Sequence, residues 1–359
     1  MKHQFPFRWT LKEARFTKDK GTVFSCFAGG GGSTMGYKLA GFDVIGCNEI
    51  DNRMMYGYCQ NHNPRFPFLE PIQDFKHRAD LPPELFALDI LDGSPPCSAF
   101  SMASVQNGGR QQRWGKKKKF REGQAEQVLD TLFFDFIELA ARLQPKVVVA
   151  ENVKGLTMGS AREYVGRIYA DFEKAGYHCQ HFILDAQTMG VPQRRERVFF
   201  IALRNDLVER VAVTRTLFDV HPVLNLNFNE APIVFGHCQD GQGREIVSPE
   251  MRKRWEARQP GDVDFGDVTK RLYGKEQTFN IYFAAPDRVC HTLSGKSTTT
   301  VLFDYPRFLS IPEVCCVSTF PQDYNFAGQL PHYVCGMSVP PVMMAQIASA
   351  IWEQWLSKF

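Results

Sequence analysis

Short apolar runs alternate with amphipathic stretches through the first half of the chain. Helical periodicity predicts helices over residues 35–40, 124–143 and 164–175. Continuous apolar runs rich in Val, Ile and Phe predict strands over residues 22–27, 42–47, 85–91, 146–150 and 198–203. Since such strands separated by helices are typical of a parallel sheet covered on both faces, the pattern predicts a doubly wound, Rossmann-like α/β domain.

The pattern changes after about residue 204. Residues 205–305 are richer in Asp, Asn, Gly and Pro and show no strand–helix alternation, which predicts a smaller domain of mostly β-strands and loops. A helical pattern at residues 342–355 then predicts that the segment 306–359 returns to the first domain, residues 1–204.

Composition narrows the class of protein. Hydrophobic residues make up 44% and charged residues 23%, as in folded soluble proteins. The net charge of +3 is too small to indicate a nucleic-acid partner by itself. The ten cysteines include no Cys-x-x-Cys pair, and no secretion signal precedes them, so we expect neither a zinc site nor a disulfide framework. No segment matches a membrane span of about 20 apolar residues, which predicts a soluble cytoplasmic protein.

A glycine cluster follows the first predicted strand, at residues 27–33 (FAGGGGS), and an acid, Glu49, follows the second. Glycines let a backbone turn tightly beside a ligand, and a strand-end acid can bind ribose hydroxyls. The pair favours a nucleoside-containing cofactor over a plain strand–helix turn. It does not distinguish NAD from S-adenosylmethionine.

Three further motifs carry candidate chemistry. Cys97, in GSPPCSAFS, lies in a loop at the carboxyl end of a strand, which favours a nucleophile over a buried structural cysteine. Glu151 begins Glu-Asn-Val after the valine-rich strand, where the alternative is an ordinary helix cap. Residues 193–197 (QRRER) precede another strand, where the alternative is a solvated basic turn.

In this order, and with residues 320–324 (FPQDY) and 336–341 (GMSVPP), the motifs resemble the C5 cytosine-specific DNA methyltransferase family of bacteria and phages. The resemblance covers the chain except for residues 205–288. It implies that Cys97 attacks C6 of a cytosine flipped out of duplex DNA and that Glu151 donates a proton or hydrogen bond at N3. Arg195 and Arg197 would contact the flipped base and its phosphate, and the sequence does not apportion these roles.

The resemblance further implies S-adenosyl-L-methionine as the methyl donor. Ile50 stands where many members have an aromatic residue, and Met337 where most have Asn. The residues that would bind the cofactor are Phe27, Ala28, Gly29, Gly31, Gly32, Glu49, Ile50, Asp74, Pro96, Leu132, Met337 and Ser338.

The loop after Cys97 is strongly basic, with no acid from residue 101 to residue 121. We interpret it as a phosphate-binding lid, and a disordered solvated loop is the alternative. Side chains assigned to DNA are Ser101, Arg110, Arg113, Lys116, Lys117, Lys118, Lys119, Arg121, Gln193, Ser294 and Lys296. The expected partners are duplex DNA and, as for restriction–modification enzymes, a cognate endonuclease. We expect a monomer with no membrane partner.

Other functions fit less well. The RNA-modifying branch of the same family usually has a Cys-Phe-Thr motif, which is absent here. An inactive DNA-binding regulator would have no need of Cys97, Glu151 and both arginines. A nicotinamide dehydrogenase would require neither Pro-Pro-Cys nor Glu-Asn-Val.

Overall fold

The computed structural model describes residues 3–96, 117–118, 127–128, 131–158, 162–216, 220–276 and 281–359. The chain forms two compact units, each assembled from separate segments. The sheet unit comprises Arg15–Leu184, Glu196–Asn227 and Met344–Phe359. The second unit comprises Met1–Ala14, Asp185–Arg195 and Phe228–Met343. The division differs from the predicted boundaries, since residues 205–227 lie in the sheet unit and residues 306–343 in the second.

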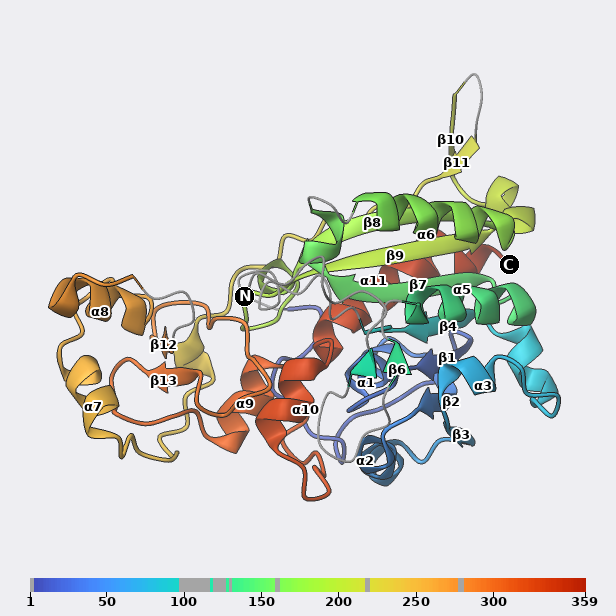
Figure 1. Cartoon of the computed structure of the whole chain (residues 1–359). Helices are drawn as coiled ribbons and strands as arrows, with labels where there is room; N and C mark the ends of the chain where they lie inside the picture. Colours follow the sequence, from blue (N-terminus) through green and yellow to red (C-terminus); the bar gives the residue numbers. More distant parts are fainter. Residues whose placement is uncertain are drawn as a thin grey trace. The chain divides into compact units, whose positions relative to one another are not determined.

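A seven-stranded sheet forms the centre of the sheet unit, in the order β3-β2-β1-β4-β7-β9-β8 (Figure 1). Its strands from β3 to β7 are parallel, whereas β9 runs antiparallel to β7. The sheet is therefore mixed, and the expectation of a parallel sheet was wrong for β9. The strands are β1 (Thr22–Cys26), β2 (Asp43–Glu49), β3 (Phe66–Leu69), β4 (Ile90–Gly93), β7 (Val147–Val153), β8 (Tyr177–Asp185) and β9 (Glu196–Arg204).

Helices cover the sheet through a core of aromatic and aliphatic side chains, among them Phe24, Phe136 and Val148. This arrangement confirms the predicted α/β fold. The helices of the sheet unit are α1 (Gly32–Leu39), α2 (Asn52–His62), α3 (Ile72–Phe75), α5 (Leu132–Leu143), α6 (Arg162–Lys174) and most of α11 (Pro341–Gln354). Its 3-10 helices are η1 (Pro83–Ala87), η2 (Lys154–Thr157), η5 (Asn205–Arg210) and η7 (Leu356–Lys358).

Two predicted elements begin later than expected. The strand expected from residue 85 starts at Ile90, because the two prolines at 82 and 83 start η1 instead. The helix expected from residue 124 starts at Leu132, and Gln127–Val128 forms a short strand, β6, paired with β5 (Lys117–Lys118).

Some elements were not predicted at all. Helix α2 is mostly polar, and Asp51 caps it by accepting hydrogen bonds from the backbone N–H groups of Arg53 and Met54. Strand β8 is an edge strand whose residues are buried only in part, so it lacks a continuous apolar run.

The second unit has its own apolar core, which includes Trp255, Phe265, Phe283 and Val301. Short strands and loops were expected here, and the structure adds two helices within that region. The elements of this unit are η4 (Ala186–Thr188), η6 (Phe235–His237), α7 (Pro249–Glu256), α8 (Phe265–Tyr273), β12 (Tyr282–Ala284), β13 (Thr300–Leu302), α9 (Ile311–Val317) and α10 (Pro331–Met337). The remaining short pair, β10 (Val213–Arg215) and β11 (Val220–Pro222), lies in the sheet unit.

A disulfide joins Cys238 to Cys316 within the second unit, across a Cα–Cα distance of 5.5 Å. No disulfide framework was expected, because no secretion signal was recognised in the sequence. The positions of two cysteines 78 residues apart carry no pairing information either. The expectation that the cysteines form no disulfide framework is therefore wrong for this pair.

Among the residues that the structure describes, one helical stretch, Pro331–Lys358, is long and apolar enough by composition to cross a membrane, although no such segment was expected from the sequence. Of its most apolar window, 89% is buried inside the protein, which is the usual environment of a core helix.

Candidate active site

The glycine cluster and Glu49 meet at the carboxyl ends of β1 and β2. The Glu49 carboxylate accepts hydrogen bonds from the backbone N–H groups of Gly29 and Asp51, each at 2.8 Å. Glu49 is 8% exposed, and burial raises its pKa while the two N–H donors oppose the shift. Each carboxylate oxygen can accept a further hydrogen bond, so the group can also hold a hydroxyl donor.

The turn that leads from Gly29 to helix α1 requires glycine at position 31. Gly31 has a φ of +70°, and a Cβ there would lie 2.2 Å from Nε2 of His62. Gly29 also has a positive φ, but the space beside it is open, because a Cβ there would lie 3.9 Å from the nearest atom, the Phe27 carbonyl oxygen. An open glycine turn beside a buried carboxylate fits the ribose and backbone contacts of a nucleoside such as S-adenosylmethionine.

The other residues predicted to bind the cofactor have varied surroundings. Phe27 has a φ of +52° and its ring lies 6.3 Å from that of Phe136. Leu132 is fully buried in the core. The remaining residues of the sheet unit are half-buried Ala28, Ile50 and Pro96, buried Gly32, and Asp74, which is exposed on α3.

The chain leaves the sheet at Gly93, which pairs with Ala150 of β7 and precedes Cys97 by four residues. Asn152 donates a hydrogen bond from Nδ2 to the Pro95 carbonyl oxygen at 3.0 Å, and both residues are buried. The sequence had assigned no role to this asparagine. Its bond fixes the backbone two residues before Cys97, which itself lies outside the described residues.

Glu151 forms an ion pair with Arg197, whose Nε lies 3.1 Å from Oε1. The antiparallel register pairs Val153 with Arg197. Glu151 therefore lies near the end of β7 and Arg197 near the start of β9, where the two side chains can meet. Their side chains are 11% and 16% exposed. Burial lowers the pKa of the Arg197 guanidinium, and the Glu151 carboxylate opposes that shift.

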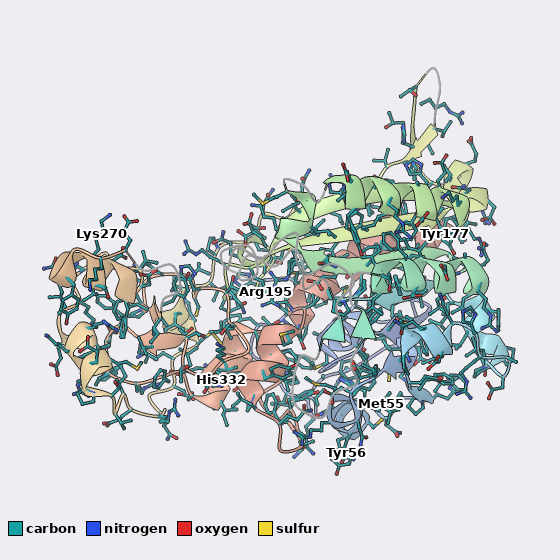
Figure 2. All side chains as sticks on the ribbon, viewed as in Figure 1. Met55, Tyr56, Tyr177, Arg195, Lys270 and His332 are labelled. Atoms are coloured by element: carbon teal, nitrogen blue, oxygen red, sulfur yellow. A yellow bond between two sulfur atoms is a disulfide. The ribbon has the colours of Figure 1, made fainter. Side chains whose placement is uncertain are left out.

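Arg195 has entirely different partners, although only one residue separates it from Arg197 (Figure 2 labels Arg195). It is 3% exposed and donates to the main-chain oxygens of Leu293, Gly336 and Ser338 at 3.4, 3.0 and 3.0 Å. These partners are all backbone atoms of the second unit, so the side chain links three segments of that unit.

Gln193, expected to contact DNA, is 1% exposed. Its Nε2 donates to the Val317 carbonyl oxygen, and its Oε1 accepts from the Leu293 N–H. Gln193 and Arg195 therefore hold the same segment of backbone from neighbouring positions.

The other predicted residues of the second unit lie nearer the surface. Met337 is 52% exposed at the end of α10, and Ser338 donates from Oγ to the Val334 carbonyl oxygen. Ser294 bonds Thr299 through their hydroxyls at 2.8 Å, and Lys296 is exposed.

Most residues predicted for the basic lid lie outside the part of the chain that the structure describes. Lys117 and Lys118 are described only as the backbone of β5. Ser101, Arg110, Arg113, Lys116, Lys119 and Arg121 lie outside the described residues.

The sequence analysis also missed a buried acid in β4, the strand that precedes Cys97. Asp92, in β4, accepts hydrogen bonds from the Ser25 hydroxyl at 2.8 Å and the Tyr37 hydroxyl at 3.2 Å. Burial raises the pKa of Asp92 to about 7, and Glu151 adds to that rise. An acid in the otherwise apolar run Ile-Leu-Asp-Gly was the sequence signal for it.

Comparison with known proteins decides the family. The model of C-5 cytosine-specific DNA methylases matches residues 21–353. The chain belongs to this family. It is therefore a DNA cytosine-5 methyltransferase, as the sequence motifs predicted.

Individual members of the family are similar over most of the chain. The type II methyltransferase M.DdeI of Desulfomicrobium norvegicum is 34% identical, across 92% of this chain and 88% of that protein. M.Eco47II of Escherichia coli is 28% identical, across 89% of this chain and 75% of that protein. The crystal structure of a Spodoptera frugiperda DNMT2 mutant has the same fold, with a TM-score of 0.63, 16% identity and coverage of 92% and 99% of the two chains.

Proposed function

We propose that this methyltransferase modifies cytosine in duplex DNA with Cys97 as the nucleophile and Glu151 as the group facing N3. The observation that carries the proposal is the meeting of three chain segments, at the end of β7, the start of β9 and the residues that follow β4. There Glu151 pairs with Arg197, and the adjacent Asn152 binds Pro95, two residues before Cys97.

The chemistry needs both groups because C5 of cytosine is a poor nucleophile. Attack of the Cys97 thiolate on C6 makes C5 electron-rich, and negative charge builds toward N3. Glu151 donates a proton or hydrogen bond at N3, and Arg197 holds the Glu151 side chain in place. The guanidinium of Arg197 also offers cationic donors to the base and its phosphate.

S-adenosylmethionine supplies the electrophilic methyl group when it is bound. Glu49 would hold the ribose hydroxyls while the turn from Phe27 through Gly32 accommodates the rest of the nucleoside. Ile50, Asp74, Pro96 and Leu132 complete the proposed binding set, together with Met337 and Ser338. A thioether at residue 337 is at best a weak acceptor, so Met337 loses a hydrogen bond that Asn could make.

Arg195 and Gln193 act as positioning residues in this proposal, because their bonds go to buried main-chain groups. DNA would be held instead by the basic segment 101–121 and by Ser294 and Lys296. Residues of the second unit between 228 and 305, which overlap the smaller domain predicted from the sequence, would read the target sequence.

The curated relatives are type II methyltransferases. We propose the same role here, protection of DNA against a cognate restriction endonuclease, in the cytoplasm and as a monomer.

The test begins with bisulfite sequencing of DNA from cells that express the protein, which identifies the methylated site. With S-adenosylmethionine present, a duplex with 5-fluorocytosine at that site should then form a denaturation-resistant adduct, because C5 carries fluorine after methyl transfer and has no proton to lose for release of the enzyme. Cys97→Ser should bind the duplex but form no adduct. A tRNA substrate is the comparison arm.

An adduct formed by Cys97→Ser would contradict the assignment of the nucleophile. Methylation of tRNA without methylation of the duplex would contradict the assignment of the substrate.

A further inference from the structure

Three sulfur-bearing side chains meet in the sheet unit, and the proposed function uses none of them. Met55 and Cys59 are four residues apart in helix α2, a spacing that places both side chains on one face of the helix. Cys47 lies on β2, and its Sγ is 3.7 Å from Sδ of Met55. The Cys59 Sγ is also 3.7 Å from that Met55 sulfur (Figure 2 labels Met55). Cys47, Met55 and Cys59 thus form a sulfur cluster in which two thiols share one thioether neighbour.

The distances within the sulfur cluster match those around a single metal ion. A metal–thiolate bond is about 2.3 Å long, so three sulfurs in a plane around one ion lie about 4 Å apart. The two separations of 3.7 Å are close to that value. The Cys47 and Cys59 thiols are also near enough that a charge on Cys59 raises the pKa of Cys47. An ion among the three sulfurs would therefore require only a small outward movement of each.

Burial shields the sulfur cluster from water, with Cys59 nearest to solvent. Cys47 is 0% exposed and Met55 is 6% exposed, whereas Cys59 is half-buried. Burial raises the pKa of both thiols, so both are protonated at neutral pH. The Tyr58 hydroxyl hydrogen-bonds the Cys47 sulfur and opposes the rise. Such a donor stabilises a thiolate once its proton has left, as outer-shell partners of metal ligands do.

The donor set favours a soft ion of low coordination number. Thiolate and thioether sulfurs favour Cu(I) over hard divalent cations. Zn²⁺ also binds thiolates, but its structural sites usually have four ligands from Cys, His and carboxylate side chains. In the part of the chain that the structure describes, no group of three or more His, Cys, Asp or Glu side chains is placed to hold a metal ion. Cu(I), which accepts three sulfur ligands, therefore fits the cluster better than Zn²⁺.

We propose that Cys47, Met55 and Cys59 form a binding site for Cu(I). On binding, Cys47 and Cys59 each lose a proton to solvent, since the thiolate is the form that binds a metal. The two thiolates and the Met55 thioether donate electron pairs to the ion, whose oxidation state does not change. Tyr58 is a positioning residue for the Cys47 thiolate. The site goes beyond the proposed function, because neither S-adenosylmethionine nor DNA takes part in it.

The experiment measures Cu(I) binding by the full chain without oxygen, in competition with a chromogenic Cu(I) chelator. Cys97→Ser is the background for every variant, so that the proposed nucleophile contributes no thiolate. The background protein should bind one Cu(I), and X-ray absorption at the copper edge should show three sulfur neighbours at about 2.3 Å. Met55→Leu keeps the apolar volume but removes the thioether. It should leave two sulfur neighbours and weaken binding at least about tenfold, which is the lower range for losing even an outer-shell partner of a metal ligand.

Each variant has a matched control in the same unit. Met54→Leu should bind copper as the background does, because Met54 is the neighbouring buried methionine of α2 and lies outside the sulfur cluster. Cys59→Ser should abolish tight binding. Cys179→Ser should not, because it removes a buried thiol that donates to the Gln180 carbonyl oxygen instead.

Circular dichroism of each variant separates a loss of copper binding from a loss of fold. Unchanged copper affinity in folded Met55→Leu or Cys59→Ser would overturn the proposal. A background protein that takes no copper from the chelator would overturn it as well, as would nitrogen or oxygen neighbours in place of the three sulfurs.

Discussion

At the scale of single residues, identical side chains in one motif have different surroundings. The Arg195 guanidinium donates to three main-chain oxygens in a buried site, whereas Arg197 pairs with the Glu151 carboxylate. The contrast comes from where each residue lies along the chain, because Arg197 belongs to β9, which pairs with β7, whereas Arg195 precedes that strand and belongs to the second unit. The two arginines should therefore differ in what their removal affects.

We expect Arg195→Lys to destabilise the fold and Arg197→Lys to affect mainly the reaction. Lysine cannot reproduce the planar fork that reaches several carbonyl groups, so Arg195→Lys should cost about 1.5–3 kcal/mol of unfolding free energy. Arg197→Lys should change stability by less than about 1 kcal/mol and slow adduct formation with a 5-fluorocytosine duplex. Urea unfolding and adduct kinetics on both variants check this. The reverse pattern would contradict the distinction.

At the scale of elements, β4 and β7 bring the site together, and β4 carries an acid in its buried interior. Asp92 lies between Ser25 of β1 and Tyr37 of α1. The two hydroxyl donors lower the pKa of Asp92, but burial raises it by more, so the pKa is about 7. The element that leads to Cys97 is therefore sensitive to pH.

The sign of that sensitivity follows from proton linkage. The folded pKa of Asp92 lies above the value of about 3.9 expected for an unfolded chain, so the folded state holds the proton more tightly. The resulting stability is fully present below about pH 4 and is lost as the pH rises toward 7. Asp92→Asn stays neutral, so its unfolding free energy should fall less than that of the wild type between pH 5 and pH 7.

Urea unfolding at several pH values measures this difference. The control is Asp80→Asn, because the Arg78 side chain lowers the pKa of Asp80, the direction opposite to Asp92. Equal pH dependence in Asp92→Asn and the wild type would show that Asp92 does not titrate in this range.

At the scale of the whole molecule, the two units differ in what stabilises them. The sheet unit has a large continuous apolar core, while the core of the second unit around Trp255 is smaller. The disulfide between Cys238 and Cys316 lies in the second unit and joins residues 78 apart in sequence. A crosslink of that span reduces the entropy of the unfolded chain.

Reduction of this disulfide should therefore destabilise the second unit by about 4 kcal/mol. Thermal unfolding followed by Trp fluorescence, with and without a reductant, should show a lower midpoint after reduction. Cys238→Ser should have that lower midpoint under both conditions. Cys59→Ser, which removes a free cysteine of the sheet unit, should still respond to the reductant. A wild-type midpoint that ignores the reductant would contradict a stabilising disulfide.

Local chemistry was readable from the sequence, and long-range arrangement was not. The glycine turn and Glu49 were predicted together because each follows an apolar strand, and the structure joins them by a hydrogen bond. The direction of β9 was not predictable, since an apolar run has the same pattern whichever way the strand runs. The partners of Arg195 lie 98 to 143 residues away and are backbone atoms, which no side-chain motif encodes.

Those backbone partners bear on how such enzymes could diverge. Every residue type has a main-chain oxygen, so the segments around residues 293 and 336–338 can change sequence while Arg195 keeps its acceptors. A hybrid that receives residues 228–343 from a relative would retain Gln193 and Arg195 from this chain. Its grafted segment would need the right backbone path rather than particular side chains. Recombination could therefore replace this whole segment during evolution, because Arg195 would find the same main-chain acceptors in each new sequence.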